Sequence, residues 1–254
     1  MFSESGDLYD HIYTAMKDYA AEARAVAQVI RAHLPDARDV LDVACGTGEH
    51  ARHLATAHAF RVDGVDLDPV LISHAQTKNI GGRFTVQDMV GFDLGRTYDA
   101  VICMFSSIGY AVTLDRVVTA LVAMGRHLRP RGVLLVEPWF EPGRLQDGYV
   151  TLQTTETDTT KIARVSRNQI MDRVSHFRFE YLVAGADGIR HLVEQHDLGL
   201  FTRAEMESAF RQARLGVSFE EPGPSGRGLY VATRDDVPEG GGSGGSRPSH
   251  PAGV

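Results

Sequence analysis

Hydrophobic and polar residues follow two periods that alternate over the first 137 positions of the chain. Apolar side chains three and four positions apart across residues 17–34 predict an amphipathic helix, and a shorter helix is expected around residues 8–13. Short apolar runs typical of buried strands then alternate with helical segments, which indicates an α/β fold with a doubly wound, mostly parallel sheet. We expect strands at 39–44, 61–67, 83–87, 98–105 and 133–137, and helices at 48–57, 68–78 and 113–128, with RPRG as a break before the last strand.

The pattern changes after Pro138, where polar, threonine-rich and β-prone segments follow one another. Four of these segments predict an antiparallel β insert. A helix and two terminal strands, VSFEE and LYVAT, would return the chain to the main sheet, whereas the last residues contain nothing from which a core could be built. The predicted divisions are N-terminal helices and a Rossmann-like core at 1–137, an insert at 138–199, a return to the core at 200–236 and a disordered tail at 237–254. Within the insert we expect strands at 150–157, 160–167, 173–184 and 190–199. The return to the core contains a helix expected at 203–213.

Composition excludes several classes of protein. A chain of 254 residues with 43% hydrophobic and 23% charged residues has the balance of an ordinary globular protein. Its net charge of −7 lacks the Lys/Arg excess that nucleic-acid binding requires, and no apolar run has the length of a membrane span or the features of a signal peptide. The only cysteines, Cys45 and Cys103, form neither a disulfide framework nor a zinc motif. We therefore expect a cytoplasmic protein with no metal, no nucleic-acid partner and no membrane partner.

The segment LDVACGTGEHARHL, residues 41–54, predicts a strand that opens into a nucleotide-binding turn. Gly46 and Gly48 let the backbone approach a ligand closely, and the helix that follows offers free N–H groups to an anion. Asp66 follows twenty residues after Gly46, at the end of the next strand, where an acid can bind ribose hydroxyls. These three residues suit a nicotinamide dinucleotide and an adenosyl cofactor equally well.

Two further acids favour the adenosyl cofactor. Asp42 lies four residues before Gly46, and Asp88 ends the third expected strand, where its carboxylate can accept a hydrogen bond from an adenine amino group. Asp42, Asp66 and Asp88 would then lie at one edge of the sheet, which is where open α/β sheets bind ligands. The set indicates S-adenosylmethionine (SAM) as the cofactor.

With these motifs the chain resembles the N,N-dimethyltransferases that act on nucleotide-linked 3-amino-deoxysugars, as in desosamine and mycaminose biosynthesis. DVACGTG (42–48) and QDM (87–89) are common to many methyltransferases, whereas CMFSSIG (103–109), VEPW (136–139) and GPSGRG (223–228) are far more specific. The resemblance implies a class I methyltransferase fold, with a seven-stranded sheet and an antiparallel insert. It also implies methyl transfer from SAM to the amine of a nucleotide-linked amino sugar in antibiotic biosynthesis, and a homodimer.

The resemblance further assigns residues to the site. Those that would bind the cofactor are Tyr19, Ala44, Gly46, Gly48, Asp66, Asp88, Met89 and Met104. Those that would bind the acceptor are Tyr9, Trp139, Phe140, Arg164, Ser166 and Arg227. Tyr110 and Glu137 would be the catalytic residues, with Glu137 holding or deprotonating the amine, and the guanidinium of Arg227 would match a diphosphate. Arg164 and Ser166 would assist Arg227, although the insert could equally form a dimer surface.

The chain departs from the family in the expected acceptor pocket. Tyr110 stands where the related sugar enzymes carry a histidine, and a phenol is a weaker base than an imidazole at neutral pH. The aromatic pair after VEP is also changed, reading Trp139-Phe140 before Glu141. N-methylation of a different amine-bearing natural product is therefore an alternative. A nicotinamide-dependent oxidoreductase and a non-catalytic binder of the adenosyl cofactor are two others.

Overall fold

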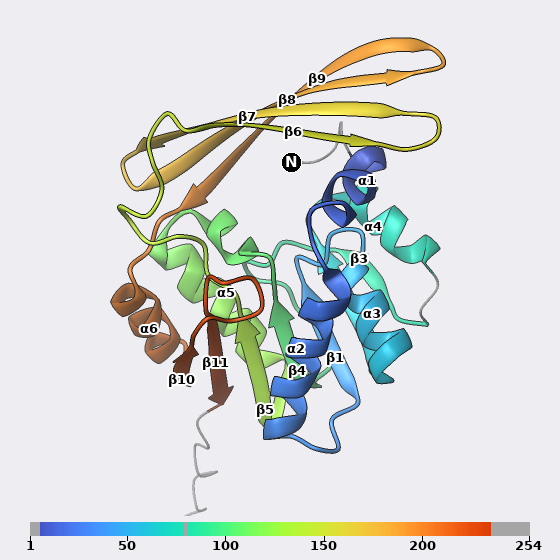
Figure 1. The fold of residues 1–254 in the computed structure, drawn as a ribbon. Coiled ribbons are helices and arrows are strands. Elements are labelled where there is room, and N and C mark those ends of the chain that lie inside the picture. Colours follow the sequence, from blue (N-terminus) through green and yellow to red (C-terminus); the bar gives the residue numbers. More distant parts are fainter. Residues whose placement is uncertain (1–5, 79–80, 235–254) are drawn as a thin grey trace, which may run out of the picture.

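The computed structural model of the protein describes residues 6–78 and 81–234. The tail expected at 237–254 lies outside the described residues. Figure 1 shows a seven-stranded sheet with helices on both faces and a separate four-stranded sheet above it. Both the mostly parallel main sheet and the antiparallel insert predicted from the sequence are confirmed.

The main sheet has the strand order β10-β11-β5-β4-β1-β2-β3. Strands β1 to β5 pair in parallel, and β11 joins the sheet antiparallel to β5. The carboxyl ends of the five parallel strands therefore meet at one edge of the sheet. The strands are β1 (Asp39–Val43), β2 (Arg61–Asp66), β3 (Phe84–Val86), β4 (Tyr98–Cys103), β5 (Leu128–Val136), β10 (Leu215–Glu220) and β11 (Leu229–Arg234).

Several helices begin at residues suited to that position. Asp68 caps α4 by accepting from the Val70 N–H, and Pro69 occupies the first turn, where no backbone donor is needed. Thr202 and Glu205 form a reciprocal capping box at the start of α6. The helical elements are η1 (Gly6–Leu8), α1 (Tyr9–Thr14), α2 (Tyr19–His33), α3 (Glu49–His58), α4 (Pro69–Thr77), η2 (Ser107–Ala111), α5 (Leu114–Arg126) and α6 (Arg203–Gln212).

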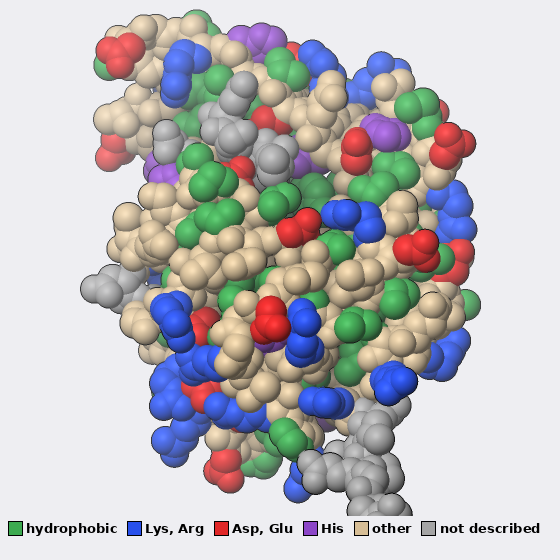
Figure 2. Space-filling model, turned by 180° about the vertical axis from the view of Figure 1, so that it is seen from behind, with side chains coloured by type: hydrophobic (Ala, Val, Ile, Leu, Met, Phe, Trp, Pro, Cys, Tyr) green, Lys and Arg blue, Asp and Glu red, His purple; other side chains and the backbone are tan. Residues whose placement is uncertain are grey.

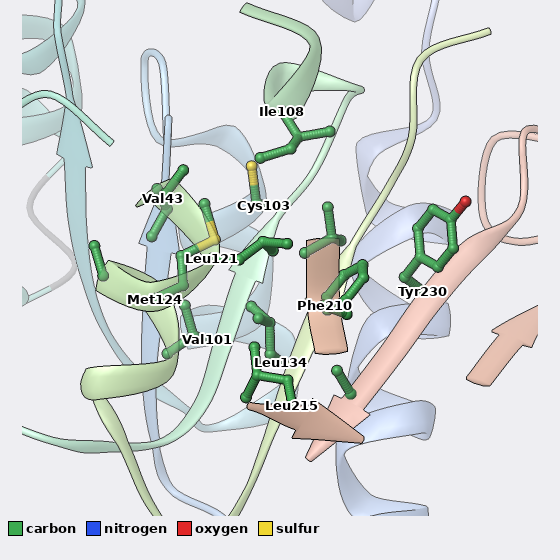
Figure 3. Packing of buried hydrophobic residues seen from close by; sticks show 14 of the residues in the cluster. Val43, Val101, Cys103, Ile108, Leu121, Met124, Leu134, Phe210, Leu215 and Tyr230 are labelled. Atoms are coloured by element: carbon green, nitrogen blue, oxygen red, sulfur yellow. The ribbon is translucent and has the colours of Figure 1, made fainter. Parts of the chain in front are cut away.

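Two apolar cores lie on opposite faces of the main sheet. On one face α5 and α6 contribute Leu121, Met124 and Phe210, which pack against the strands as shown in Figure 3. On the other face α2, α3 and α4 contribute residues such as Ile30 and Leu54. Because β1 is buried at every position, both layers hold it in place, and the turn that follows it starts from a rigid support.

The insert consists of four strands in the order β6-β7-β8-β9, all antiparallel. It lies across the carboxyl edge of the main sheet, with α1 between the two sheets (Figure 1). Its inner face buries Ile162, Tyr181 and Val183 together with Tyr9 and Tyr13 of α1. The insert therefore covers the strand ends. Its strands are β6 (Val150–Glu156), β7 (Lys161–Met171), β8 (Val174–Gly185) and β9 (Gly188–Gly199).

The prediction of a break at RPRG is wrong, because β5 begins at Leu128 and continues through this segment. Tyr98 pairs with Leu128, whereas Ala100 pairs with Val133, so β5 carries extra residues in a bulge. Arg131 has a left-handed φ of 65° within it. A bulge absorbs these residues without ending the strand.

The amino edge of the main sheet carries a cluster of ion pairs, which we call the amino-edge cluster: Asp39, Asp63, Asp99, Arg61, Arg96 and Arg129. Figure 2 shows Lys and Arg side chains gathered at the lower end of the molecule with Asp and Glu among them. On the face shown there, charges of both signs are mixed, so no continuous basic surface is visible. Within residues 6–78 and 81–234, no helix is long and apolar enough to cross a membrane, and no set of His, Cys, Asp or Glu side chains is arranged to hold a metal ion.

Candidate active site

The turn after β1 has an uncommon backbone conformation. Ala44, Gly46 and Gly48 adopt left-handed φ angles of 58°, 57° and 79°. A Cβ at Gly48 would lie 3.1 Å from the Cβ of Ala75, so a larger residue would also press against α4. Gly48 is the N-cap of α3 and has no side chain with which to cap it, which leaves the first N–H groups of that helix available to a ligand.

Asp66, at the end of β2, holds this turn in place. Its Oδ2 accepts a hydrogen bond from the Gly46 N–H at 2.8 Å, and its Oδ1 accepts one from the Asp68 N–H at 2.9 Å. Burial raises the pKa of its carboxyl, although these backbone donors oppose the shift. Each oxygen keeps a further lone pair, so the same carboxylate can also accept from the hydroxyls of a ribose.

Asp42 is the one acid of the three that is almost completely buried. It is 1% exposed, and its Oδ2 has no hydrogen-bond partner among the described residues. Burial, together with the charge of Asp66, raises the pKa of Asp42 to about 8. A nearby cation would favour the ionised form of this buried carboxyl, and SAM carries positive charge on its sulfonium and its amino group.

A pocket opens beside the turn. Five of the residues expected to hold the cofactor or acceptor lie around it, namely Tyr9, Tyr19, Ala44, Gly46 and Met104. The full lining is Tyr9, Tyr19, Ala44, Cys45, Gly46, Thr47, Glu49, His50, Met104, Phe105 and Ser107. The structure therefore brings together residues from α1, α2, the turn and the end of β4.

Four expected cofactor residues lie outside this lining: Gly48 and Asp66, which belong to the turn described above, and Asp88 and Met89. The side chain of Asp88 is 44% exposed, with its Oδ2 3.6 Å from Arg116. Met89 packs instead against the core beneath α5. Asp88 is thus free to accept a hydrogen bond at the rim, whereas Met89 contributes mainly to packing. The assignment of both residues to the adenine stays a prediction.

The sequence analysis missed a charged group beside the pocket. The Lys17 ammonium lies 3.4 Å from the centre of the Phe105 ring and 2.9 Å from Glu22. Glu22 also accepts from His50 at 2.8 Å. Lys17 precedes the first turn of α2 and follows no periodic pattern, so the sequence carries no signal for it. Its position shows that the face of Phe105 accepts a cation.

Glu137 and Arg227, both predicted for the acceptor site, form an ion pair. Glu137 is fully buried, and its Oε1 accepts from Arg227 Nη2 at 2.8 Å and from the Ser225 hydroxyl. Its Oε2 accepts from the Phe105 N–H at 3.0 Å. This geometry does not support Glu137 as the base for the amine, because both oxygens are engaged and its charge is balanced. It gives Glu137 the role of fixing Phe105 and Arg227.

The aromatic residues expected near the acceptor surround this ion pair. The Arg227 guanidinium lies 5.7 Å from the ring centres of both Trp139 and Phe140 and 6.0 Å from that of Phe105. Three ring faces therefore surround one cation, an arrangement that favours positive charge. An acceptor that reaches this region would meet aromatic surface and one guanidinium.

Arg164 and Ser166 do not join Arg227 in the structure. Arg164 is buried beneath the insert, where it donates to the Tyr13 hydroxyl at 3.1 Å and to Gln153. Ser166 is buried and hydrogen-bonded to Thr151. Both residues stabilise the insert. Arg164, Ser166 and Arg227 therefore do not form one diphosphate-binding site.

Tyr110 lies in η2, and its hydroxyl is 3.0 Å from Nδ1 of His196 in β9. His196 is not among the site residues predicted from the sequence, so this contact is new. It joins the carboxyl edge of the main sheet to the inner face of the insert.

Known proteins resemble this chain in sequence and in fold. A methyltransferase-domain profile matches residues 40–132, from β1 into β5. The dTDP-3-amino-3,6-dideoxy-α-D-glucopyranose N,N-dimethyltransferase of Streptomyces fradiae is 42% identical over 230 residues, covering 90% of either chain. This chain belongs to the N,N-dimethyltransferases of nucleotide-linked amino sugars.

Further members of the family agree with it. The dTDP-3-amino-3,4,6-trideoxy-α-D-glucopyranose N,N-dimethyltransferase of Streptomyces venezuelae is 39% identical, covering 90% of this chain and 97% of its own. Among solved structures, Streptomyces venezuelae DesVI has a TM-score of 0.85 at 38% identity, over 91% of this chain and 98% of that chain. SAM-bound CalS10, an amino pentose methyltransferase from Micromonospora echinaspora involved in calicheamicin biosynthesis, has a TM-score of 0.80 at 40% identity, over 89% of this chain and 96% of that chain.

Family membership makes the chain a SAM-dependent N-methyltransferase with the class I fold. The site described above fits this cofactor. The left-handed turn provides close approach, Asp66 keeps lone pairs for a ribose, and the buried Asp42 oxygen, which has no partner in the described part of the chain, suits a cationic ligand.

Proposed function

We propose that this enzyme transfers methyl groups from SAM to the amine of a nucleotide-linked amino-deoxysugar in antibiotic biosynthesis. The observation that carries the proposal is the match to the Streptomyces fradiae and Streptomyces venezuelae dimethyltransferases over nine tenths of the chain, insert included. A match to the cofactor-binding core alone would not identify the acceptor. The match here also includes the insert and the loop at 223–228, which lie outside that core. The comparisons give no support to a nicotinamide-dependent oxidoreductase.

The cofactor would lie along the turn after β1. In this arrangement Asp66 binds the ribose, Asp88 and Met89 border the adenine, and Ala44, Gly46 and Gly48 supply close backbone. Tyr19 and Met104 line the pocket at its other side. Bound there, SAM supplies a methyl group on a cationic sulfur. The cation is favoured by the carboxylate form of Asp42.

The acceptor would enter between the strand ends and the insert, towards Tyr9, Trp139, Phe140 and Arg227. A neutral amine is already a competent nucleophile, so the protein contributes mainly by orienting it. Alignment of two bound reactants can lower a barrier by about 7–11 kcal/mol. We place Arg227 near the acceptor through its ring cluster, with Glu137 fixing its orientation. Arg164 and Ser166 would act only by holding the insert in position.

The direct test incubates the protein with SAM and dTDP-3-amino-3,6-dideoxy-α-D-glucopyranose and follows the sugar by mass spectrometry. We expect first a monomethylated and then a dimethylated sugar. The same nucleotide sugar with a hydroxyl in place of the amine is the control and stays unmodified. Binding of S-adenosylhomocysteine without any methylated sugar would reject this acceptor in favour of another amine.

We further propose a cytoplasmic homodimer. Four apolar side chains share the outer face of the insert and are 41–67% exposed: Val150, Leu152, Val165 and Leu182. Covering them by a second copy would remove apolar surface from water. Cys45 and Cys103 are buried free thiols, which supports a reducing compartment such as the cytoplasm. Light scattering of the wild type and of Leu182→Glu tests the dimer: a monomeric wild type would reject it.

A further inference from the structure

The inner face of the insert carries a buried histidine that contacts the carboxyl edge of the main sheet. His196 in β9 is 3% exposed, and its Nδ1 lies 3.0 Å from the Tyr110 hydroxyl. The two rings meet edge to face, with centroids 5.9 Å apart. Tyr110 itself is 38% exposed, whereas the imidazole behind it is buried.

An acid lies on the other side of the same imidazole. The Nε2 of His196 is 3.6 Å from Oε2 of Glu194, which also accepts from the Tyr181 hydroxyl of β8 at 3.2 Å. Glu194 and His196 are two residues apart in β9, so the pleat places both on the inner face. Tyr110, His196 and Glu194 therefore form a continuous line from a partly exposed tyrosine to a buried acid.

Each element near His196 contributes one charged or titratable group. These groups are Tyr110 of η2, Tyr13 of α1, Arg164 of β7, Tyr181 of β8 and Glu194 of β9. Arg164 donates to Tyr13 and stacks on Phe179, which itself contacts the His196 ring. Glu194 is thus the negatively charged group next to the imidazole. A carboxylate in that position stabilises an imidazolium.

The phenol by itself is a poor base. Desolvation beneath the insert, together with the charge of Asp66, raises the pKa of Tyr110 well above its ordinary value. Tyr110 therefore keeps its proton at neutral pH and can accept another only while it passes its own to His196. If Nε2 carries the ring hydrogen, Nδ1 is the acceptor for the Tyr110 hydroxyl, and the Nε2–H faces Glu194.

We infer that Tyr110 and His196 form a proton relay that deprotonates the acceptor amine, an inference that rests on the proposed N-methyltransferase function. The bound ammonium gives a proton to the Tyr110 oxygen as the phenolic proton moves to Nδ1 of His196, leaving an imidazolium beside Glu194. The freed nitrogen lone pair then forms a bond to the methyl carbon while the carbon–sulfur bond breaks and its electron pair stays on sulfur. Tyr110 touches the amine, whereas His196 acts through Tyr110 as a positioning residue.

Position in the fold supports this direction of transfer. Phe105 and Ser107, which lie at the start of the loop and helix that carry Tyr110, line the cofactor pocket. The charge of Asp66 also contributes to the pKa of Tyr110. The phenol therefore stands between the cofactor region and the insert, which is where an amine must lie to meet a methyl group. Each methylated product is again an ammonium, so a second round requires the imidazolium to return its proton through Tyr110 to water when the product leaves.

The test has two arms and three variants: Tyr110→Phe, His196→Gln and the control His191→Gln. His191 is on the same strand, exposed on the opposite face and paired with Glu180, so its loss should change neither arm. The first arm needs no turnover. Nitrogen-15 NMR of the histidine rings should show His196 as the Nε2–H tautomer with Nδ1 accepting, and the Nδ1 signal should change in Tyr110→Phe.

The second arm measures kcat against pH with dTDP-3-amino-3,6-dideoxy-α-D-glucopyranose. At neutral pH we expect His196→Gln to lower kcat about 100-fold, with a smaller loss at higher pH where the amine is deprotonated by the solvent. The double variant should be no slower than the slower single variant, because both residues act on one proton. The affinity for S-adenosylhomocysteine should not change in any variant.

The outcomes separate the relay from the proposed function. An Nδ1–H tautomer, or a His196 signal that ignores Tyr110→Phe, overturns the relay whether or not this sugar is a substrate. An equal loss of kcat at every pH would also overturn it, because that result describes a structural role. If the wild type binds S-adenosylhomocysteine but leaves this sugar unmethylated, the proposed substrate fails, and the NMR arm still decides whether the relay exists.

Discussion

Two aspartates three residues apart in β1 have opposite surroundings. Asp39, at the amino edge of the sheet, is held by Arg61 and Arg129 at 2.7 Å each and by Arg96 at 3.4 Å. The hydrogen bond from Arg61 is the main cause that lowers the pKa of Asp39. Asp42, towards the carboxyl edge, has an oxygen without a partner among the described residues, and its pKa is raised to about 8.

The difference divides the sheet into an edge that contributes stability and an edge that contributes binding. In the amino-edge cluster each carboxylate is matched by guanidinium groups of the protein. At the carboxyl edge, Asp42 and Asp66 are buried close together without any such partner, which is unfavourable in the empty fold. A cationic, hydroxyl-bearing cofactor would offset that cost. Substitutions at the two edges should therefore act on different quantities.

The largest effect should come from Asp66→Ala. Loss of its carboxylate removes the acceptor for a ribose and frees the Gly46 N–H that it holds. We expect the Kd for S-adenosylhomocysteine to rise about 100-fold, as for the loss of charge-assisted hydrogen bonds. Isothermal titration measures it. Asp63→Ala, on the same strand but in the amino-edge cluster, is the matched control, and an equal loss of affinity there would contradict the division.

Asp39→Ala should lower the stability of the protein and leave its affinity for the cofactor unchanged. It leaves Arg61 and Arg129 without their shared carboxylate, so we expect the free energy of unfolding in urea to fall by about 2 kcal/mol. The Kd for S-adenosylhomocysteine should remain that of the wild type. A protein of unchanged stability, or one that loses the cofactor, would show that the two edges are not independent.

Asp42→Asn sharpens the comparison through pH. Because the folded protein holds the Asp42 proton up to about pH 8 while the unfolded chain loses it near pH 4, the wild type loses stability as the pH rises through this window. The asparagine variant lacks this loss. The difference in unfolding free energy should therefore grow in its favour by at most about 1.4 kcal/mol per pH unit. Parallel curves from pH 4 to 8 would show that Asp42 does not titrate as described.

Asp88→Ala should give the smallest effect. Its side chain is half-exposed, with Oδ1 accepting from the Val90 N–H at 2.9 Å and Oδ2 3.6 Å from Arg116, so water competes for any hydrogen bond to the adenine. We expect the Kd for S-adenosylhomocysteine to rise about five-fold, equivalent to about 1 kcal/mol, with stability lowered by no more than about 1 kcal/mol through loss of the Val90 hydrogen bond. A loss as large as that of Asp66→Ala would place Asp88 at the centre of the cofactor site rather than at its rim.

Local patterns in the sequence predicted the backbone of the turn after β1, because its determinants are adjacent. Gly46, Gly48 and the strand before them fix the backbone within a few residues, and the spacing to Asp66 follows from one strand–helix–strand unit. The bulge at RPRG was missed, because proline and glycine predict a break as readily as a bulge.

Contacts between distant elements could not be predicted. Glu137 and Arg227 were both expected in the site, but a pattern of residues does not show that they neutralise each other across 90 positions. Glu194 and His196 do carry a signal, since residues two apart in a strand share a face. Their link to Tyr110 depends on how the insert lies over the main sheet, which no local pattern specifies.

A crystal structure with S-adenosylhomocysteine tests the central claim most directly. We predict that the ribose hydroxyls donate to Asp66, that the adenine lies beside Asp88, and that the amino-acid end lies in the pocket between Tyr19 and Phe105. A ligand bound at the amino-edge cluster, or one that leaves Asp66 untouched, would contradict it.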